Sequence, residues 1–233
     1  MRSFRDLIFP PLCLHCSSLI EHDSSYLCSE CMEKLQLIDH TERCPLCFSS
    51  DYLPGAKHCS ICKPNELYLH HIAAAFDYVG PAASIIRKLK YGNQPYLAKG
   101  AGAFLVAQFV QLEWPIPDFI VPIPISTTHW LERGYNQSQL LAESFSLLLD
   151  RPLLNVLHRK SGDYSQAGMN RQQRNALVTS SFYLKKELTF YDKTILLIDD
   201  VMTTGSTLQR CAEVLREGCP KDIFALTCCR AIK

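Results

Sequence analysis

Eight of the twelve cysteines stand in four C-x2-C pairs within the first 62 residues, and this pattern restricts the fold more than any other feature of the chain. The arrangement C-x2-C-x11-C-x2-C occurs twice, and the second copy begins 31 residues after the first. Such self-similarity indicates two copies of one small unit. The copies consist of Cys13, Cys16, Cys28 and Cys31, and of Cys44, Cys47, Cys59 and Cys62.

Zinc accounts for these pairs, because it prefers four tetrahedral thiolates and a C-x2-C turn supplies two of them. A module of about sixty residues buries too little apolar surface to fold well alone, so a metal ion is the expected stabiliser. The spacing favours two sequential zinc ribbons, one per copy, although a cross-braced pairing stays open. Four thiolates leave no position for a substrate, which predicts that both ions are structural.

Other interpretations of the cysteines fit less well. An iron–sulfur cluster also binds four cysteines, but two evenly spaced sets are more typical of ribbons. Redox dithiols usually sit on a thioredoxin-like βαβ unit. Four histidines are alternative metal ligands, although complete cysteine sets make them unnecessary: His15, His22, His40 and His58. The later cysteines lack paired spacing and are expected in the core: Cys211, Cys219, Cys228 and Cys229.

Charge and hydropathy indicate a soluble, cytoplasmic protein. Asp6 interrupts the N-terminal apolar residues, and no later apolar stretch approaches the ~20 residues that a membrane span needs. In the cytoplasm thiols stay reduced, which disfavours disulfides. The net charge of +1 gives no overall field that would attract nucleic acid.

After residue 65 the pattern becomes that of an α/β protein. Apolar strands are expected at 71–79, 118–125, 182–184, 193–198 and 222–228, and helices at 82–90, 96–112, 136–149 and 206–217. This alternation predicts a mostly parallel sheet with helices on both faces. We therefore expect two domains, residues 1–65 and 66–233, packed together because no long linker separates them.

The segment from Ile195 to Thr207 (ILLIDDVMTTGST) carries the strongest chemical signal. Ligands of open α/β sheets bind beyond the carboxyl ends of the strands. Here backbone N–H groups, hydroxyls and a helix N-terminus converge into an anion cradle, and Gly205 allows close approach. The absence of lysine excludes a Walker-type site.

The two acids of this segment, Asp199 and Asp200, indicate what the anion is attached to. Carboxylates repel phosphate but accept hydrogen bonds from sugar hydroxyls, so we expect a sugar phosphate such as ribose 5-phosphate. They would also stabilise positive charge that develops at an anomeric carbon. A simpler interpretation, in which the hydroxyls only cap the helix, leaves the paired acids unexplained.

The same segment resembles the motif D-D-x-x-T-T-G-x-T, which binds phosphoribosyl pyrophosphate (PRPP) in the phosphoribosyltransferase fold. Further motifs follow the order seen in the ComF/GntX family: FDYVGP from Phe76, LKY from Leu89, VPIP from Val121, RGYNQ from Arg133 and QAGM from Gln166. This resemblance implies a double zinc ribbon fused to a type I phosphoribosyltransferase-like parallel sheet flanked by helices. It also implies a role in natural transformation, when single-stranded DNA enters the cytoplasm.

The resemblance further implies a set of site residues. Asp199 and Asp200 would bind ribose and be the catalytic residues, within a PRPP site made of Asp199, Asp200, Val201, Met202, Thr203, Thr204, Gly205, Ser206 and Thr207. Arg133, Asn136 and Gln137 would face the pyrophosphate and its Mg²⁺, under a cover at 159–174 with Gln166 and Arg171. Asp163 and Leu177 depart from the family pattern. Simpler roles are a surface position for Arg133 and an N-cap for Asn136.

Three functional hypotheses follow. The first is a PRPP- or ribose-phosphate-binding protein of the competence type that handles single-stranded DNA, together with proteins of the DNA-uptake machinery. Arg87, Lys88, Lys90 and Tyr91 combine cations with an aromatic ring and are candidates for nucleic-acid binding, although a solvated helix face explains them equally well. The second is an active phosphoribosyltransferase whose acceptor is unknown. The third is a protein–protein adaptor.

Overall fold

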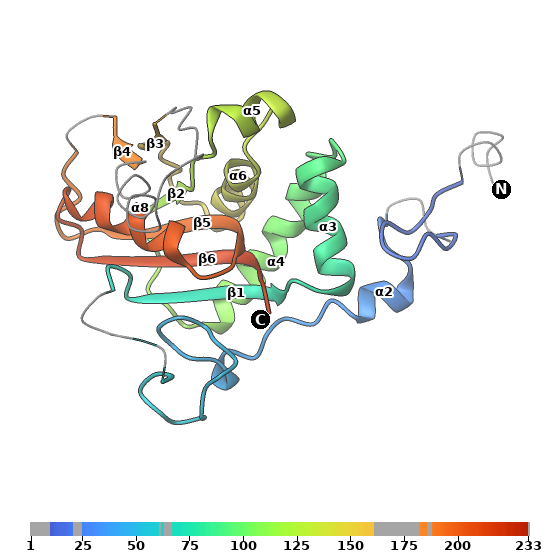
Figure 1. The fold of residues 1–233 in the computed structure, drawn as a ribbon, viewed down its shortest axis with the longest axis horizontal. Helices are drawn as coiled ribbons and strands as arrows, with labels where there is room; N and C mark the ends of the chain where they lie inside the picture. Colours follow the sequence, from blue (N-terminus) through green and yellow to red (C-terminus); the bar gives the residue numbers. More distant parts are fainter. Residues whose placement is uncertain are drawn as a thin grey trace, which may run out of the picture.

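A parallel sheet of four strands forms the centre of the computed structural model, which describes residues 10–20, 25–60, 62, 67–160, 182–185 and 188–232. The strands lie in the order β1 (His71–Asp77), β6 (Asp222–Arg230), β5 (Thr194–Met202) and β2 (Phe119–Pro122), as Figure 1 shows. In the register, Ile195 lies opposite Phe119 on one side and Ile223 on the other. The sheet confirms the predicted parallel α/β architecture.

Helices flank this sheet: α3 (Gly80–Tyr91), α4 (Leu97–Gln111), α6 (Gln137–Leu149) and α8 (Ser206–Arg216). Each of these helices buries a row of side chains that recur at helical spacing. In α8 these side chains are Leu208, Cys211, Ala212 and Leu215. The β5 residues 195–198 are at most 1% exposed, as expected for a strand that is covered on both faces. Within the described ranges, no helix has the length and apolar character required to span a bilayer.

Three features differ from the sequence prediction. Strand β5 was expected to end at Ile198, but its pairing with β6 continues to Met202, so both acids lie within the strand. A short helix, α5 (Thr127–Arg133), occupies the expected loop after β2, because Ser126 caps its start and Gly134 ends it at φ +76°. Strand β3 (Leu157–Arg159) was not predicted and pairs antiparallel with β4 (Phe182–Leu184).

The two cysteine units are built alike, in agreement with the sequence repeat. The backbone N–H of Cys13 donates to the carbonyl of Ser18 at 2.8 Å, and Cys44 donates to Ser49 at 3.0 Å. Ser17 and Phe48, which are also 31 residues apart, both adopt a left-handed backbone. Only short helical turns accompany the knuckles in the described residues: α2 (Ser29–Glu33) and the 3-10 turn η1 (His40–Glu42).

The units attach to the α/β domain in different ways, and Figure 1 shows the first lying further from the sheet. The first has its own small core, against which Ile85 of α3 packs. The second shares the main core through Phe48, and its Arg43 pairs with Asp77 at the end of β1 at 2.8 Å. The second ribbon is therefore joined directly to the carboxyl end of the sheet.

Candidate functional site

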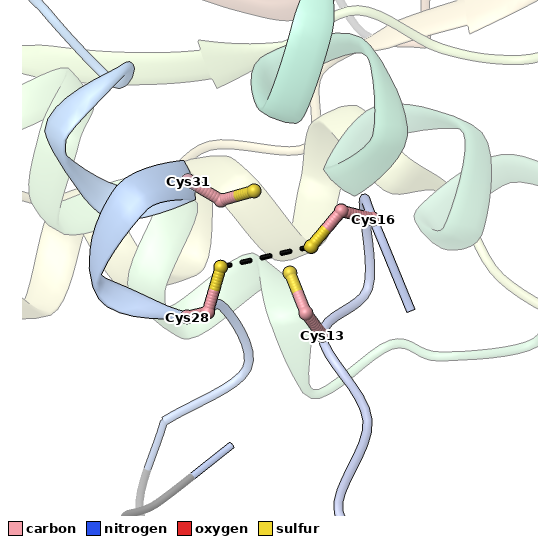
Figure 2. A group of neighbouring side chains, drawn as sticks. All are labelled: Cys13, Cys16, Cys28 and Cys31. Atoms are coloured by element: carbon pink, nitrogen blue, oxygen red, sulfur yellow. Dashed lines mark hydrogen bonds between the residues drawn. The ribbon is translucent and has the colours of Figure 1, made fainter. Parts of the chain in front are cut away.

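Each predicted cysteine set converges on one point. Within each set the four sulfur atoms lie within 4.8 Å of one another. Figure 2 shows the first set, with Cys13 and Cys16 facing Cys28 and Cys31 at the start of α2. Cys16 Sγ lies 3.6 Å from Cys28 Sγ, and the equivalent distance from Cys47 to Cys59 in the second set is also 3.6 Å. The pairing is therefore sequential rather than cross-braced.

This donor set fits zinc. Four thiolates at the Zn–S distance of about 2.3 Å stand roughly 3.8 Å apart around a tetrahedral ion. The backbone N–H of Cys59 donates to Cys44 Sγ at 3.2 Å, a contact that supports the thiolate form. His15 Nδ1 contacts Ser84 Oγ, and His58 Nδ1 contacts the Cys59 carbonyl. Neither histidine belongs to the two groups of converging ligand atoms, which consist of cysteines. With four thiolates each, both sites have a structural role.

The two acids at the end of β5 have different partners, because successive side chains of a strand point to opposite sides. Asp199 Oδ1 accepts from the Ser138 hydroxyl, at the start of α6, at 2.7 Å. Asp200 Oδ1 pairs with Lys90 Nζ of α3 at 2.9 Å. The strand thus aims one acid toward each of the two helices that border the site.

Burial and the neighbouring charge of Asp200 raise the pKa of Asp199 to about 7. The donated hydrogen bonds of the Ser138 hydroxyl and the Asp200 backbone act in the opposite direction without cancelling the shift. A carboxyl group that titrates near neutral pH can hold or release a proton under ordinary conditions.

The loop that follows β5 has the features expected of an anion cradle. Gly205 adopts φ +77° and precedes α8 as an N-cap residue that has no side chain. The Ser206 N–H, the first of the helix, donates to the Thr204 hydroxyl at 3.4 Å, and the N–H groups that follow it in the first turn have no acceptor within the helix. The hydroxyl residues of the loop are exposed, and the Thr204 hydroxyl donates to Ser206 Oγ at 3.0 Å. Val201 and Met202, by contrast, belong to the strand, and Met202 is buried. Of the predicted PRPP-binding segment, the groups that are exposed to a ligand are therefore the hydroxyls of the loop, whereas the buried Met202 side chain is not.

The residues predicted to face pyrophosphate lie at the junction of α5 and α6. Asn136 caps α6 by accepting from the Ser138 N–H at 3.1 Å, and its amide donates to the Ile123 carbonyl at 2.9 Å. Arg133 Nη1 donates to Gln137 Oε1 at 3.0 Å. Since Ser138 also binds Asp199, this junction adjoins the phosphate loop. The capping role of Asn136 is thus confirmed, and it is compatible with a role in the site.

The basic cluster of α3 divides into two parts. Lys90 turns toward Asp200, whereas Arg87 and Lys88 are exposed. Tyr91 is 75% exposed, and the guanidinium of Arg133 lies 5.1 Å from the centre of its ring. One member of the cluster therefore belongs to the phosphate-loop site, and the others form a surface next to it.

Gln166, Arg171 and the departures at Asp163 and Leu177 lie outside the described residues. Sequence reasoning missed Ser138, whose only signal was its place two residues after Asn136.

The late cysteines were expected in the core, and Cys211, Cys228 and Cys229 are buried. For Cys219 the prediction was wrong, because this residue lies exposed in the turn after α8 with φ +55°.

Known proteins resemble both parts of the chain. Residues 136–232 match the family model of the phosphoribosyl transferase domain, and residues 4–63 match that of the double zinc ribbon domain. Competence protein F of Haemophilus influenzae is 28% identical over 213 residues, which cover 88% of this chain and 90% of that protein. Competence protein ComFC of Streptococcus pneumoniae is 29% identical over 206 residues, or 88% of each chain. DNA utilization protein YhgH of Escherichia coli K12 is 26% identical over 235 residues, covering 97% of this chain and 100% of that protein.

Proposed function

Because the chain belongs to the ComF family, with a double zinc ribbon ahead of a phosphoribosyltransferase domain, we propose that it binds a ribose 5-phosphate group, carried by PRPP, and acts in competence. The 5-phosphate occupies the loop from Thr203 to Thr207, and the ribose hydroxyls bind Asp199 and Asp200. We place the boundary between the two domains near residue 65. Zinc in the ribbons supports the fold, and Mg²⁺ accompanies PRPP.

The observation that carries this proposal is the junction of β5 and α8. Two carboxylates lie near the end of a buried strand, and a short loop with exposed hydroxyls leads from that strand to the N-terminus of α8. The cradle favours an anion, and the acids favour hydroxyl donors a few ångströms away. A phosphorylated sugar provides both groups in one ligand.

We further propose that the protein handles single-stranded DNA that enters the cytoplasm. Support comes from the competence and DNA-utilization names of its relatives and from the exposed surface beside the site. There Tyr91 offers a ring for base stacking, with Arg87 and Lys88 nearby on the same helix to neutralise phosphates. Residues 1–64 contribute six Lys and Arg against eight Asp and Glu, so binding through the ribbons is not favoured by charge.

Fluorescence anisotropy with a labelled single-stranded oligonucleotide tests this role. Binding should weaken steeply with salt, and Arg87→Gln with Lys88→Gln should reduce both the affinity and the salt dependence. The matched control is the double variant Lys99→Gln with Lys221→Gln, because both of these lysines are exposed and lie elsewhere on the molecule. Undetectable binding at low salt, with or without PRPP, would remove the DNA-handling role and leave ribose-phosphate binding intact.

An active phosphoribosyltransferase is the second candidate, favoured by the match of residues 136–232 to the phosphoribosyl transferase domain and by the two acids that precede the phosphate loop. Asp199 and Asp200 would then stabilise positive charge at the anomeric carbon as pyrophosphate leaves. Release of pyrophosphate from PRPP and Mg²⁺ in the presence of candidate acceptors tests this activity. No release with any acceptor, while PRPP still binds, would favour the binding function alone.

A further inference from the structure

The ends of three neighbouring strands form a row at the carboxyl edge of the sheet. In the register of the sheet, Asp77 of β1 lies opposite Arg230 of β6, and Arg230 lies opposite Met202 of β5. The backbone N–H of Ala231 also donates to the Met202 carbonyl at 2.8 Å, just before the phosphate loop begins at Thr203. The end of β6 therefore holds the point at which the phosphate loop leaves β5.

The second zinc ribbon contacts this row of strand ends at two points. The guanidinium of Arg43 pairs with the carboxylate of Asp77 at 2.8 Å. Arg230 Nη1 donates to the backbone carbonyl of Cys47, and the same nitrogen lies 3.7 Å from Met202 Sδ. One guanidinium thus contacts both a residue of the second metal site and the last strand residue before the phosphate loop.

A cavity of about 580 Å³ lies between the second ribbon and the phosphate loop. Its lining includes Cys47 from the ribbon, Thr203 and Thr204 from the loop, and Arg230 from the end of β6. The side chain of Arg230 therefore stands at the border of the space that separates the two segments, where it can transmit the position of one to the other.

The position of the Cys47 carbonyl depends on the metal ion. A small ribbon owes much of its order to the ion that its cysteines bind, so removal of the ion frees the C-x2-C turn that carries this carbonyl. An ion held by four thiolates also has net negative charge, which the guanidinium groups of Arg43 and Arg230 offset. Loss of the second ion should therefore release the Arg230 side chain from the ribbon.

The first ribbon is attached to the α/β domain at helices and not at this row of strand ends. The residue that stands 31 positions before Arg43 is Leu12, which has no charge to pair with Asp77. Ile85 of α3 packs against the small core of the first ribbon, and the ring of Tyr26 lies 5.1 Å from that of Tyr96 at the start of α4. The two metal sites therefore differ in their connection to the phosphate loop.

We propose that Arg230 is a positioning residue for the phosphate loop, and that it links the affinity of this loop for phosphorylated ribose to the zinc ion of the second ribbon and not to that of the first. This inference rests on the proposed ribose-phosphate function and names the residue that holds its loop in place. Because linkage between two binding sites is reciprocal, a ligand in the loop should raise the zinc affinity of the second ribbon by the same factor.

Calorimetric titration of full-length, zinc-loaded chains with PRPP and Mg²⁺ tests the positioning role. Arg230→Gln should weaken binding about tenfold, whereas Arg230→Lys, which keeps a donor for the Cys47 carbonyl, should stay within about threefold of the parent. Arg216→Gln is the matched control and should bind as the parent does. Exposed Arg216 also donates to a backbone carbonyl, that of Tyr68 at 3.2 Å, but it stands at the other end of α8 from the loop.

Zinc affinity gives a readout that a merely structural role of Arg230 would not change. Cys16→Ser removes a ligand from the first site, so the second site is the complete one in this variant. Competition with a zinc-selective chelator should show that PRPP and Mg²⁺ raise the zinc affinity of Cys16→Ser about tenfold, and by less than about twofold once Arg230→Gln is added. In the parent, the affinity of the first ribbon for its ion should be the same with and without PRPP, which also controls for chelation of zinc by PRPP itself.

Equal affinity for PRPP in the parent and in a folded Arg230→Gln would overturn the positioning role while leaving the proposed function standing. Equal zinc affinity of Cys16→Ser with and without bound PRPP would overturn the linkage, and this measurement requires no change at Arg230. A gain of the same size at both ions would also overturn it. If PRPP does not bind the parent, the proposed function fails and the inference fails with it. Weaker binding in Arg230→Gln, together with a gain confined to the second ion, supports the inference.

Discussion

The ammonium group of Lys90 lies 2.9 Å from Oδ1 of Asp200, so an ion pair joins the end of α3 to the end of β5. Both side chains are largely buried, at 19% and 9% exposure. A charge removed from water is tolerated when a partner compensates for it. The position of the strand end that carries the phosphate loop therefore depends on a helix that begins more than a hundred residues earlier in the chain.

Lys90→Met should destabilise the protein, because it leaves Asp200 buried without its ion partner. We expect a loss of about 2–3 kcal/mol, below the usual cost of breaking a fully buried pair because Lys90 keeps some exposure to solvent. Urea unfolding measures the change. Lys88→Met on the same helix is exposed and should stay within about 0.5 kcal/mol of the parent. Equal stability of the two variants would contradict a structural role for the pair.

Asp199→Asn should stabilise the protein more at high pH than at low pH. The pKa of Asp199 is about 7 in the folded chain and about 3.9 in an unfolded one. The proton on Asp199 therefore stabilises the folded chain. This contribution to the free energy of unfolding is fully present below about pH 4 and is lost as the pH rises through about 7. Melting curves should show a larger advantage of Asp199→Asn at pH 8 than at pH 5, and a constant difference would show that Asp199 does not titrate in this window.

Gly205→Ala should be destabilising because of backbone conformation rather than crowding. The residue adopts φ +77°, and an added Cβ would meet its nearest neighbours, Ile72 and Met202, at an ordinary 3.6 Å. The left-handed conformation should cost about 1–2 kcal/mol. Gly100→Ala, inside α4 with nothing within 4 Å, should instead stabilise by up to about 1 kcal/mol. Thermal unfolding that shows the same sign for both changes would refute this assignment.

Metal analysis should find two zinc ions per chain. Cys16→Ser and Cys47→Ser should each reduce the content to one ion, because each removes a ligand from a separate four-cysteine site. Cys219→Ser should keep both ions, because Cys219 belongs to neither set. Loss of both ions after a single substitution would indicate a shared site. Elemental analysis combined with native mass spectrometry provides the count.

Patterns local in sequence predicted a large part of this fold. Paired spacing located both metal sites, and hydrophobic periodicity located the four strands of the parallel sheet and the main helices. The end of β5 could not be predicted in this way, because Asp199 and Asp200 look like loop residues until β6 is known to pair alongside them. Helix α5 was missed because the prolines before it masked the capping serine, Ser126.

The candidate site was predictable only where one segment supplies it. The hydroxyls and glycine of the phosphate loop are contiguous, so their chemistry is visible in the sequence. Lys90 and Ser138 reach the acids from separate helices, and Arg230 reaches the ribbon from the last strand. Contacts of this kind depend on tertiary packing, which residue spacing does not encode. For the same reason the cavity at the second ribbon appears only in the folded chain.

Titration of the full-length protein with PRPP and Mg²⁺ in a calorimeter tests the central claim, that this loop binds a phosphorylated ribose. Saturable binding is expected, and Asp199→Asn and Asp200→Asn should each weaken it roughly ten- to a hundredfold, since each loses charge-assisted hydrogen bonds worth about 1.5–3 kcal/mol. Asp192→Asn, an exposed acid in the turn before β5, should bind as the parent does. No heat of binding, or equal affinity in all three variants, would contradict the account.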